Sequence, residues 1–278
     1  MVGVAVGVSM KQGRLAGKVA IVTGAAPQGP GIGNGSAVAI LFAHEGAQVV
    51  LVNRSEDRVR KLQRTIEEEG GDCFVCVADV TKANEVERMV ETTIQRYGKL
   101  NILHNNVGGG GDSGVGEPVV ELTEDAWDRC LTVNLKSAMM CCKYSIPRML
   151  EAGGGSIINV SSMVGAIGVR DPKTSLVAYS TAKAGVSGFT RALAAEYAAD
   201  GIRVNCIMIG MVESPLIVAL QGAEVLEKRR RAIPLQTTGT GWDVGWAAVY
   251  LASDESRWVT GVELPIDGGQ LRILDRPR

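Results

Sequence analysis

The sequence has almost no excess of either charge, because its 278 residues contain 29 lysines and arginines against 30 aspartates and glutamates. It also lacks a basic stripe, so we do not expect it to bind nucleic acid. Residues 1–13 are apolar and small, but they have no basic n-region, no clear cleavage site and too little length to cross a bilayer. The sequence therefore predicts a loose N-terminal arm over residues 1–13, no membrane association and a cytoplasmic location.

Histidine is also scarce, and the cysteines are not grouped as metal ligands would be. The chain has 2 histidines, and its 6 cysteines have no histidine or acidic cluster at ligand spacing, so we expect free thiols and no metal site. Cys73 and Cys76 have the C-x-x-C spacing, but they lie in a strand-like run in which they face opposite sides of a sheet. His104, in an apolar strand end, and His44, late in a helix, are interpreted as packed core residues rather than catalytic bases.

Hydrophobic residues make up 46% of the chain, which is enough to bury a substantial core, and we expect one α/β domain over residues 14–278. Short apolar runs that suit buried strands alternate with helix-like segments. Strands are predicted at residues 18–22, 48–52, 73–78, 102–108, 156–162, 202–207 and 262–266. Helices are predicted at residues 36–45, 56–69, 124–150, 175–199 and 242–251, with another from about residue 82.

Two side chains near the start of the predicted helix 175–199 suit proton transfer. Tyr179 and Lys183 are four residues apart, so the phenol and the ammonium point into the same space. The neighbouring cation favours the phenolate and predicts a lowered pKa for Tyr179. Such a pair is common on ordinary helix surfaces. However, Ser162 ends the preceding apolar strand, and buried parallel strands deliver their last residues to a ligand crevice, so the three side chains predict an active site.

Residues 23–35 form a glycine-rich segment between a predicted strand and a predicted helix. Strand, glycine loop and helix in this order indicate a phosphate site, because glycines permit close backbone approach and a helix N-terminus favours an anion. A strict G-x-G-x-x-G is absent, and the alternative is a simple glycine-rich turn.

Together these motifs resemble the short-chain dehydrogenase/reductase family, in its compact single-domain branch, and the likeness runs from Lys18 to Gly269. The family's Thr-Gly-x-x-x-Gly-x-Gly pattern is matched at Thr23, Gly24, Gly31 and Gly33, with three extra loop residues before Gly31 and with Ile32 at the variable position. The resemblance implies a three-layer, doubly wound, Rossmann-like α/β fold with about seven mostly parallel strands, and a homotetramer.

The resemblance also implies the roles of individual residues. The catalytic set is Asn134, Ser162, Tyr179 and Lys183, with the helix locally bent at Asn134. An NAD(P) cofactor is expected to contact the glycine loop, Tyr179, Lys183 and a further set that comprises Asn53, Arg54, Asp79, Val80, Asn106, Gly108, Gly210, Val212 and Ser214. Asp79 has an alternative role as the N-cap of the helix that starts near residue 82.

The residues after the second strand bear on the choice of cofactor. An acidic residue there would bind the ribose 2′-hydroxyl and repel a phosphate, but this chain has Asn53 and Arg54. Arg54 suits a 2′-phosphate, which favours NADP(H) over NAD(H). The alternatives are that Asn53 binds the ribose of NAD(H), that Arg54 lies on adenine, or that Arg54 is merely solvated.

The resulting functional hypothesis is reversible hydride transfer between the nicotinamide and a ketone or secondary alcohol, with Tyr179 as the general acid and base. One alternative is a reductase of 3-oxoacyl thioesters, which the basic residues 228–231 would suit unless they form a solvated helix face. Others are a non-catalytic NAD(P)-binding sensor and a halide-eliminating relative. Residues 211–234 are expected to form the substrate lid, and the longer spacing from Ser162 to Tyr179 to reshape the pocket wall.

Overall fold

In the computed structural model, the described residues are 13–27, 29, 31–109, 116–170, 175–213 and 222–273. Their strands are β1 (Val19–Thr23), β2 (Gln48–Asn53), β3 (Cys73–Val77), β4 (Ile102–Asn105), β5 (Gly155–Ser162), β6 (Ile202–Ile209) and β7 (Glu263–Ile266). These seven form one sheet in the order β3-β2-β1-β4-β5-β6-β7, with every neighbouring pair parallel. The predicted α/β fold is confirmed.

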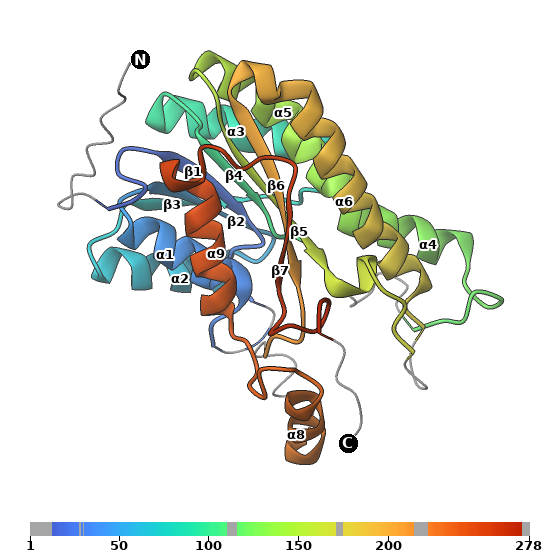
Figure 1. The fold of residues 1–278 in the computed structure, drawn as a ribbon. Helices are drawn as coiled ribbons and strands as arrows, with labels where there is room; N and C mark the ends of the chain where they lie inside the picture. The colour runs from blue at the N-terminus through green and yellow to red at the C-terminus, as the bar shows by residue number, and fades with distance from the viewer. Residues whose placement is uncertain are drawn as a thin grey trace, which may run out of the picture.

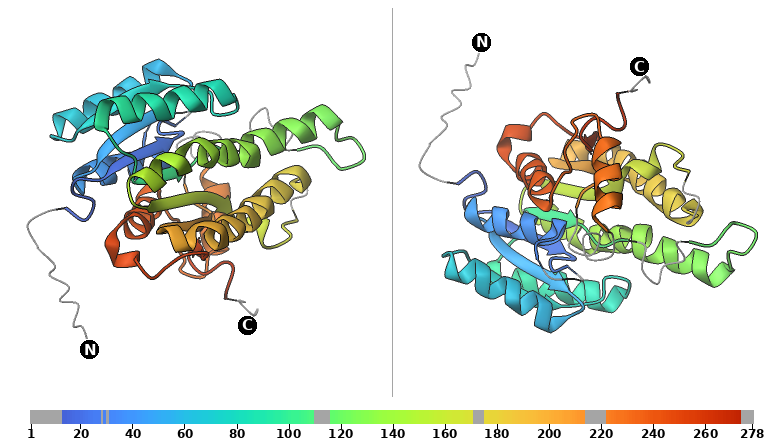
Figure 2. Two further views of the ribbon diagram at one scale, coloured as in Figure 1. Left: turned by 90° about the horizontal axis from the view of Figure 1, so that it is seen from above. Right: turned by 90° about the horizontal axis from the view of Figure 1, so that it is seen from below.

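The helices follow the strands as crossover connections. They are α1 (Asn34–His44), α2 (Glu56–Glu68), α3 (Ala83–Tyr97), α4 (Glu124–Leu131), α5 (Ser137–Glu151), α6 (Val177–Tyr197), α8 (Ala223–Arg231) and α9 (Gly241–Ala252). α1, α2 and α9 cover one face of the sheet, and α3, α5 and α6 cover the other (Figures 1 and 2). None of the helices among the described residues is long and apolar enough to cross a membrane.

The core consists of two apolar layers, one on each face of the sheet. Successive residues of a strand point to opposite faces, so Val49 and Leu51 join one layer while Val50 and Val52 join the other. Cys73 and Cys76 likewise fall in different layers, and each of the six cysteines is a free, buried thiol. This confirms the expected packing role of the C-x-x-C pair.

Two expectations need correction. His44 is exposed and contacts Glu69 at 2.6 Å, because it lies on the solvent side of the last turn of α1. The N-cap of α3 is Lys82, whereas the Asp79 carboxylate accepts bonds from the Thr81 amide and hydroxyl and so forms a separate turn. Within the expected arm, only residue 13 is described, and Gly13 packs tightly against the carbonyl of Glu45.

Candidate active site

A cavity of about 1380 Å³ lies along the carboxyl ends of the strands. It exceeds the roughly 300–1,000 Å³ of a typical small-molecule site, so it has room for a cofactor and a substrate together. The predicted residues that line it are Gly24, Gly33, Asn53, Arg54, Asp79, Val80, Asn106, Gly108, Ser162, Tyr179, Lys183, Gly210 and Val212. Thr23, Gly31, Ile32 and Asn134 do not line it, and Ser214 is outside the described residues.

The end of β5 holds the start of α6 through three consecutive residues. The Val160 carbonyl accepts a 2.9 Å bond from Lys183 Nζ, and the Ser161 hydroxyl donates a 2.8 Å bond to the Lys183 carbonyl. The side chains of Ser162 and Tyr179 are hydrogen-bonded to each other. Lys183 Nζ lies 5.6 Å from the centroid of the Tyr179 ring, so the three predicted side chains converge as expected.

Burial controls the protonation of this group. Desolvation raises the pKa of Tyr179 to about 12, although its hydrogen bond with Ser162 acts in the opposite direction. Desolvation also lowers the pKa of Lys183 to about 8, because the residue is only 3% exposed. The lowered Tyr179 pKa expected from the Lys183 charge is therefore wrong for this structure, in which desolvation by burial is the largest influence on that pKa.

Asn134 lies beneath the cavity floor, in a π-helical turn over Thr132–Lys136 that separates α4 from α5. This turn is the local bend expected at Asn134. The Asn134 side chain accepts a 2.9 Å bond from the Gly109 amide and donates to the Gly109 and Cys130 carbonyls. A Cβ atom on Gly108 would lie 2.8 Å from Lys183 Nζ and 2.9 Å from Asn134 Oδ1, so only glycine fits between them.

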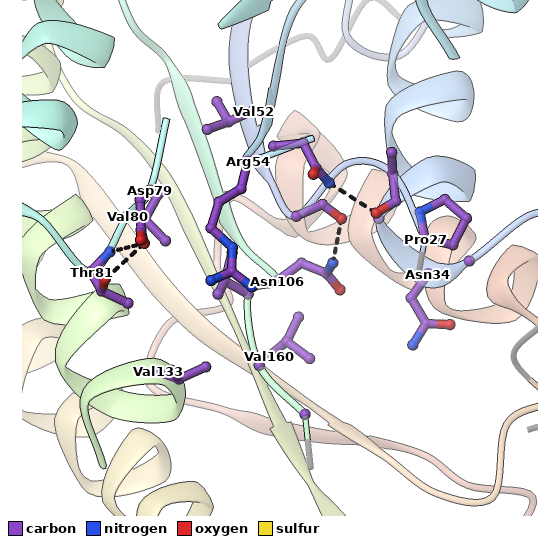
Figure 3. Close-up of a pocket in the computed structure, with 18 of the residues that line it drawn as sticks. Pro27, Asn34, Val52, Arg54, Asp79, Val80, Thr81, Asn106, Val133 and Val160 are labelled. Carbon is purple, nitrogen blue, oxygen red and sulfur yellow. Dashed lines mark hydrogen bonds between the residues drawn. The ribbon is translucent and has the colours of Figure 1, made fainter. Parts of the chain in front are cut away.

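The phosphate end of the cavity is built around the first turn of α1. Gly24 has φ of +62°, and a Cβ on Gly35 would lie 2.2 Å from the Gly24 carbonyl, so both positions need glycine. Asn106 Nδ2 donates a 3.1 Å bond to the same carbonyl (Figure 3). Thr23 supports this arrangement from below, since its hydroxyl accepts a bond from the Asn106 amide.

The helix N-terminus and its neighbours fit a dinucleotide. α1 begins at the cavity with Asn34, whose Oδ1 atom is buried and has no hydrogen-bond partner among the described residues. Free backbone donors at a helix start favour an anion, as the glycine loop predicted. We conclude that the residues present suit a pyrophosphate at this end of the cavity and a reacting carbon beside Tyr179.

The adenosine end carries two arginines. Figure 3 shows the Arg54 side chain extending from the end of β2 into the cavity, and Arg58 lines the same wall from α2. Burial alone would raise the pKa of Asp79, but the bonds from Thr81 and the charge of Arg54 outweigh it and lower that pKa. The Asn53 amide is committed elsewhere, because it donates 2.9 Å to the Ala26 carbonyl and accepts 2.9 Å from the Ser55 amide.

Several residues of the site were not predicted from the sequence. Gly35 had a signal, a glycine at the start of a helix, but the pattern that was matched ends at Gly33. Arg58 lies four residues after Arg54 and, as a second arginine near the end of the second strand, could have been predicted on the same ground. Ser161 and the Val160 carbonyl had no signal, because their contacts depend on how α6 packs on β5.

Comparison with known proteins decides the family. A family model described as enoyl-(acyl carrier protein) reductase matches residues 24–270. A candidate short-chain dehydrogenase/reductase from Burkholderia xenovorans, known from its crystal structure, is 41% identical to this chain. The two structures match with a TM-score of 0.86, over 95% of this chain and 100% of that chain. The chain belongs to the short-chain dehydrogenase/reductase family.

Other members of the family are similarly close. The 3-oxoacyl-[acyl-carrier-protein] reductase FabG of Thermotoga maritima is 36% identical and covers 92% of this chain and 98% of its own. A 7α-hydroxysteroid dehydrogenase, solved with NADH and a 7-oxo bile acid, is 30% identical with a TM-score of 0.83, over 94% of this chain and 97% of its own. This short-chain dehydrogenase/reductase is therefore an oxidoreductase that uses a nicotinamide dinucleotide.

Proposed function

We propose that Tyr179 is the general acid and base with which this enzyme interconverts a secondary alcohol and a ketone. The observation that carries the proposal is the convergence of Ser162, Tyr179 and Lys183 on one wall of the cavity. When bound, the nicotinamide supplies or accepts the hydride. The protein's own task is to align the reacting carbon and to move one proton.

Each side chain has a distinct part in that task. In reduction, Tyr179 donates its phenolic proton to the substrate oxygen, and Ser162 orients that oxygen and stabilises its developing charge. Lys183 holds ribose hydroxyls and places a positive charge beside the Tyr179 ring, where it stabilises the phenolate left behind. Asn134 supports the resupply of protons from below.

The test is Tyr179→Phe, which removes one hydroxyl and keeps the ring. We expect turnover to fall by about 10²–10⁴-fold, while affinity for NADPH changes little. Turnover would be measured on a panel of secondary alcohols and ketones that includes cyclohexanol and a 3-oxoacyl thioester. Tyr250→Phe, on the exposed face of α9, is the matched control and should keep full turnover. Full turnover in Tyr179→Phe would refute the mechanism.

The adenosine end supports NADP(H) as the preferred cofactor. Two guanidinium groups, those of Arg54 and Arg58, line this wall, and no carboxylate follows β2 at the position of Asn53. Guanidinium groups bind phosphate through charge-assisted hydrogen bonds, whereas a ribose diol gains little from them. Asn53 is the weaker candidate for binding a ribose, because both ends of its amide already hold the backbone.

Affinities for NADPH and NADH at one salt concentration test this preference. The wild type should bind NADPH more tightly, and Arg54→Ala should weaken NADPH by about 10-fold or more while NADH changes little, since one charged hydrogen bond contributes about 1.5–3 kcal/mol. Arg148→Ala, which removes an arginine paired with Glu151 on α5, controls for net charge. Equal weakening of both cofactors would place Arg54 on the adenine instead.

The 3-oxoacyl-thioester alternative gains no support from the basic residues 228–231. On α8, Lys228 pairs with Glu224, while Arg230 and Arg231 share the carboxylate of Glu227. Three of the four basic side chains thus pair with acids of the same helix, which is the solvated helix face that the sequence left open. A ketone or secondary alcohol of another class is therefore the substrate we favour.

Assembly and location are further parts of the proposal. A homotetramer, which the family resemblance implied, is supported by aromatic side chains that α9 leaves exposed at a spacing of four residues, namely Trp242, Trp246 and Tyr250. Rows of large exposed apolar side chains are typical of protein contacts. The cytoplasmic location and the single domain over residues 14–278 stay predictions from the sequence.

A further inference from the structure

The π-helical turn below the cavity leaves one backbone carbonyl without its usual donor. The Ser137 amide donates to the Thr132 carbonyl, five residues back. In a regular α-helix the same amide would donate to the Val133 carbonyl, four residues back. Val133 is half-buried and lines the cavity, and because the wide turn passes over its carbonyl, the Val133 oxygen needs another donor.

The Ser137 side chain supplies that donor. Its hydroxyl donates a 2.7 Å bond to the Val133 carbonyl, and the residue is only 2% exposed. Elsewhere in the chain such a bond duplicates a helical one: the Thr93 hydroxyl donates 2.8 Å to the Met89 carbonyl within the regular helix α3. At Ser137 the hydroxyl therefore replaces a backbone donor, whereas at Thr93 it adds to one.

The turn that Ser137 closes carries Asn134. Its Oδ1 atom accepts from the Gly109 amide, and its Nδ2 atom donates to the Gly109 and Cys130 carbonyls. If the wide turn tightened into an α-helical turn, its hydrogen-bonded ring would span one residue fewer. Asn134 would then rotate by about 100° about the helix axis. Its contacts with Gly109 would then be lost, although no atom of Asn134 itself had changed.

We propose that Ser137 is a positioning residue that keeps the turn wide and so aims Asn134 at Gly109 and the neighbourhood of Lys183. The inference rests on the role proposed above for Asn134. Removal of the Ser137 hydroxyl leaves the Val133 carbonyl unpaired. The nearest replacement donor is the backbone amide of residue 137, and a hydrogen bond from that amide to the Val133 carbonyl would tighten the turn.

Kinetics of matched variants test the proposal. Ser137→Ala should lower kcat by about 10-fold or more, with KM and the Kd for NADPH within about twofold of wild type. Ser137→Thr keeps the hydroxyl and should recover most of the loss. Thr93→Val, which deletes a buried hydroxyl with the same i−4 bond, should leave kcat unchanged. Equal kcat in wild type and Ser137→Ala would overturn the assignment.

A structural readout and a double variant separate this inference from the proposed function. In a crystal structure of Ser137→Ala, the residue 137 amide should bond to the Val133 carbonyl, and an unaltered wide turn would refute the proposal. Because Ser137 acts through Asn134, Asn134→Ala/Ser137→Ala should be no slower than Asn134→Ala. If Asn134→Ala keeps full turnover, the role of Asn134 fails. If it loses turnover and Ser137→Ala does not, only the Ser137 inference fails.

Discussion

His104 on β4 is a buried ionisable residue that the proposed mechanism does not use. It is fully buried, its ring lies 6.3 Å from that of Phe42 in an edge-on arrangement, and neither ring nitrogen has a hydrogen-bond partner among the described residues. Desolvation lowers its pKa from 6.5 to about 3, so the ring is neutral in the folded protein at pH 7. The buried imidazole, with both nitrogens unpaired, therefore lowers the free energy of unfolding.

His104→Val should remove this destabilisation. Two unpaired buried nitrogens disappear, and we expect the free energy of unfolding at pH 7 to rise by about 1–3 kcal/mol. Urea unfolding would measure this change. His44→Gln, at the exposed end of α1, is the control and should shift stability by less than about 1 kcal/mol. A loss of stability in His104→Val would mean that packing around the ring outweighs its unpaired nitrogens.

The same residue predicts how stability depends on pH. Above pH 6.5 both the folded and unfolded states hold a neutral His104, and its contribution is constant. As the pH falls from 6.5 toward about 3, only the unfolded state takes up the proton, so stability falls by about 1.4 kcal/mol per pH unit. Unfolding curves at pH 7 and pH 5 should show this loss in wild type and a smaller one in His104→Val. Equal losses would assign the pH dependence to other groups.

The two histidines also show what sequence alone can predict for a single residue. His104 lies in an unbroken apolar strand, which fixes it in the core, and its prediction is confirmed. His44 follows nine buried helical residues, so the local pattern indicated burial, but the chain turns at Glu45 and the ring points outward. The raised pKa of Tyr179 could not be predicted from the sequence for the same reason, because desolvation depends on tertiary packing.

At the scale of elements, the closest approach in the cofactor site is between α1 and the turn after β1. A Cβ on Gly35 would lie 2.2 Å from the Gly24 carbonyl and 2.6 Å from Asn106 Nδ2, which are rigidly held atoms. On α6, by contrast, a Cβ on Gly188 would meet nothing closer than 4.0 Å. Both glycines are helical, but Gly35 lies in the first turn of α1 against rigid neighbours, whereas Gly188 lies in the middle of α6 with space around it.

Replacing each glycine with alanine should therefore have opposite effects. Gly188→Ala should raise the free energy of unfolding by about 1 kcal/mol, the usual helix preference for alanine. Gly35→Ala should lower it by about 1–3 kcal/mol through overpacking, and it should weaken NADPH binding because the Gly24 turn must move. Thermal unfolding and cofactor titration measure both. A gain of stability in Gly35→Ala would show that the turn can yield without cost.

Elements were predictable where a strong local pattern set them. The apolar run that ends at Ser162 and the alanine-rich helix that carries Tyr179 were placed within two residues of β5 and α6. The π turn at Asn134 was not visible in the residue pattern, which favours one continuous helix over residues 124–150, and only the family resemblance indicated a bend. The sequence offered Asp79 as a cofactor contact or a helix cap, and the turn that its carboxylate forms with Thr81 was not predicted.

At the scale of the whole molecule, the order β3-β2-β1-β4-β5-β6-β7 brings the active site together. The chain runs outward from β1 to β3, then returns to place β4 on the other side of β1. The carboxyl ends of β1 and β4 therefore meet at a switch point, where Thr23 and Asn106 contact each other. Sequence periodicity predicts the strands but not their order, and the family resemblance implied only a doubly wound sheet of about seven mostly parallel strands; the structure gives the order itself.

The outer surface of α9 carries three exposed aromatic side chains. Trp246 is 50% exposed, with Trp242 and Tyr250 one turn before and after it at 38% and 36% exposure, on the face of α9 opposite the sheet. If this face joins two copies of the chain, a buried charge there would be costly. Trp246→Glu should then leave the fold intact and give a species smaller than a tetramer in size-exclusion chromatography with light scattering. Val225→Glu, on exposed α8, should keep the wild-type mass. A tetramer that survives Trp246→Glu would exclude α9 from the interface, and a monomeric wild type would refute the tetramer itself.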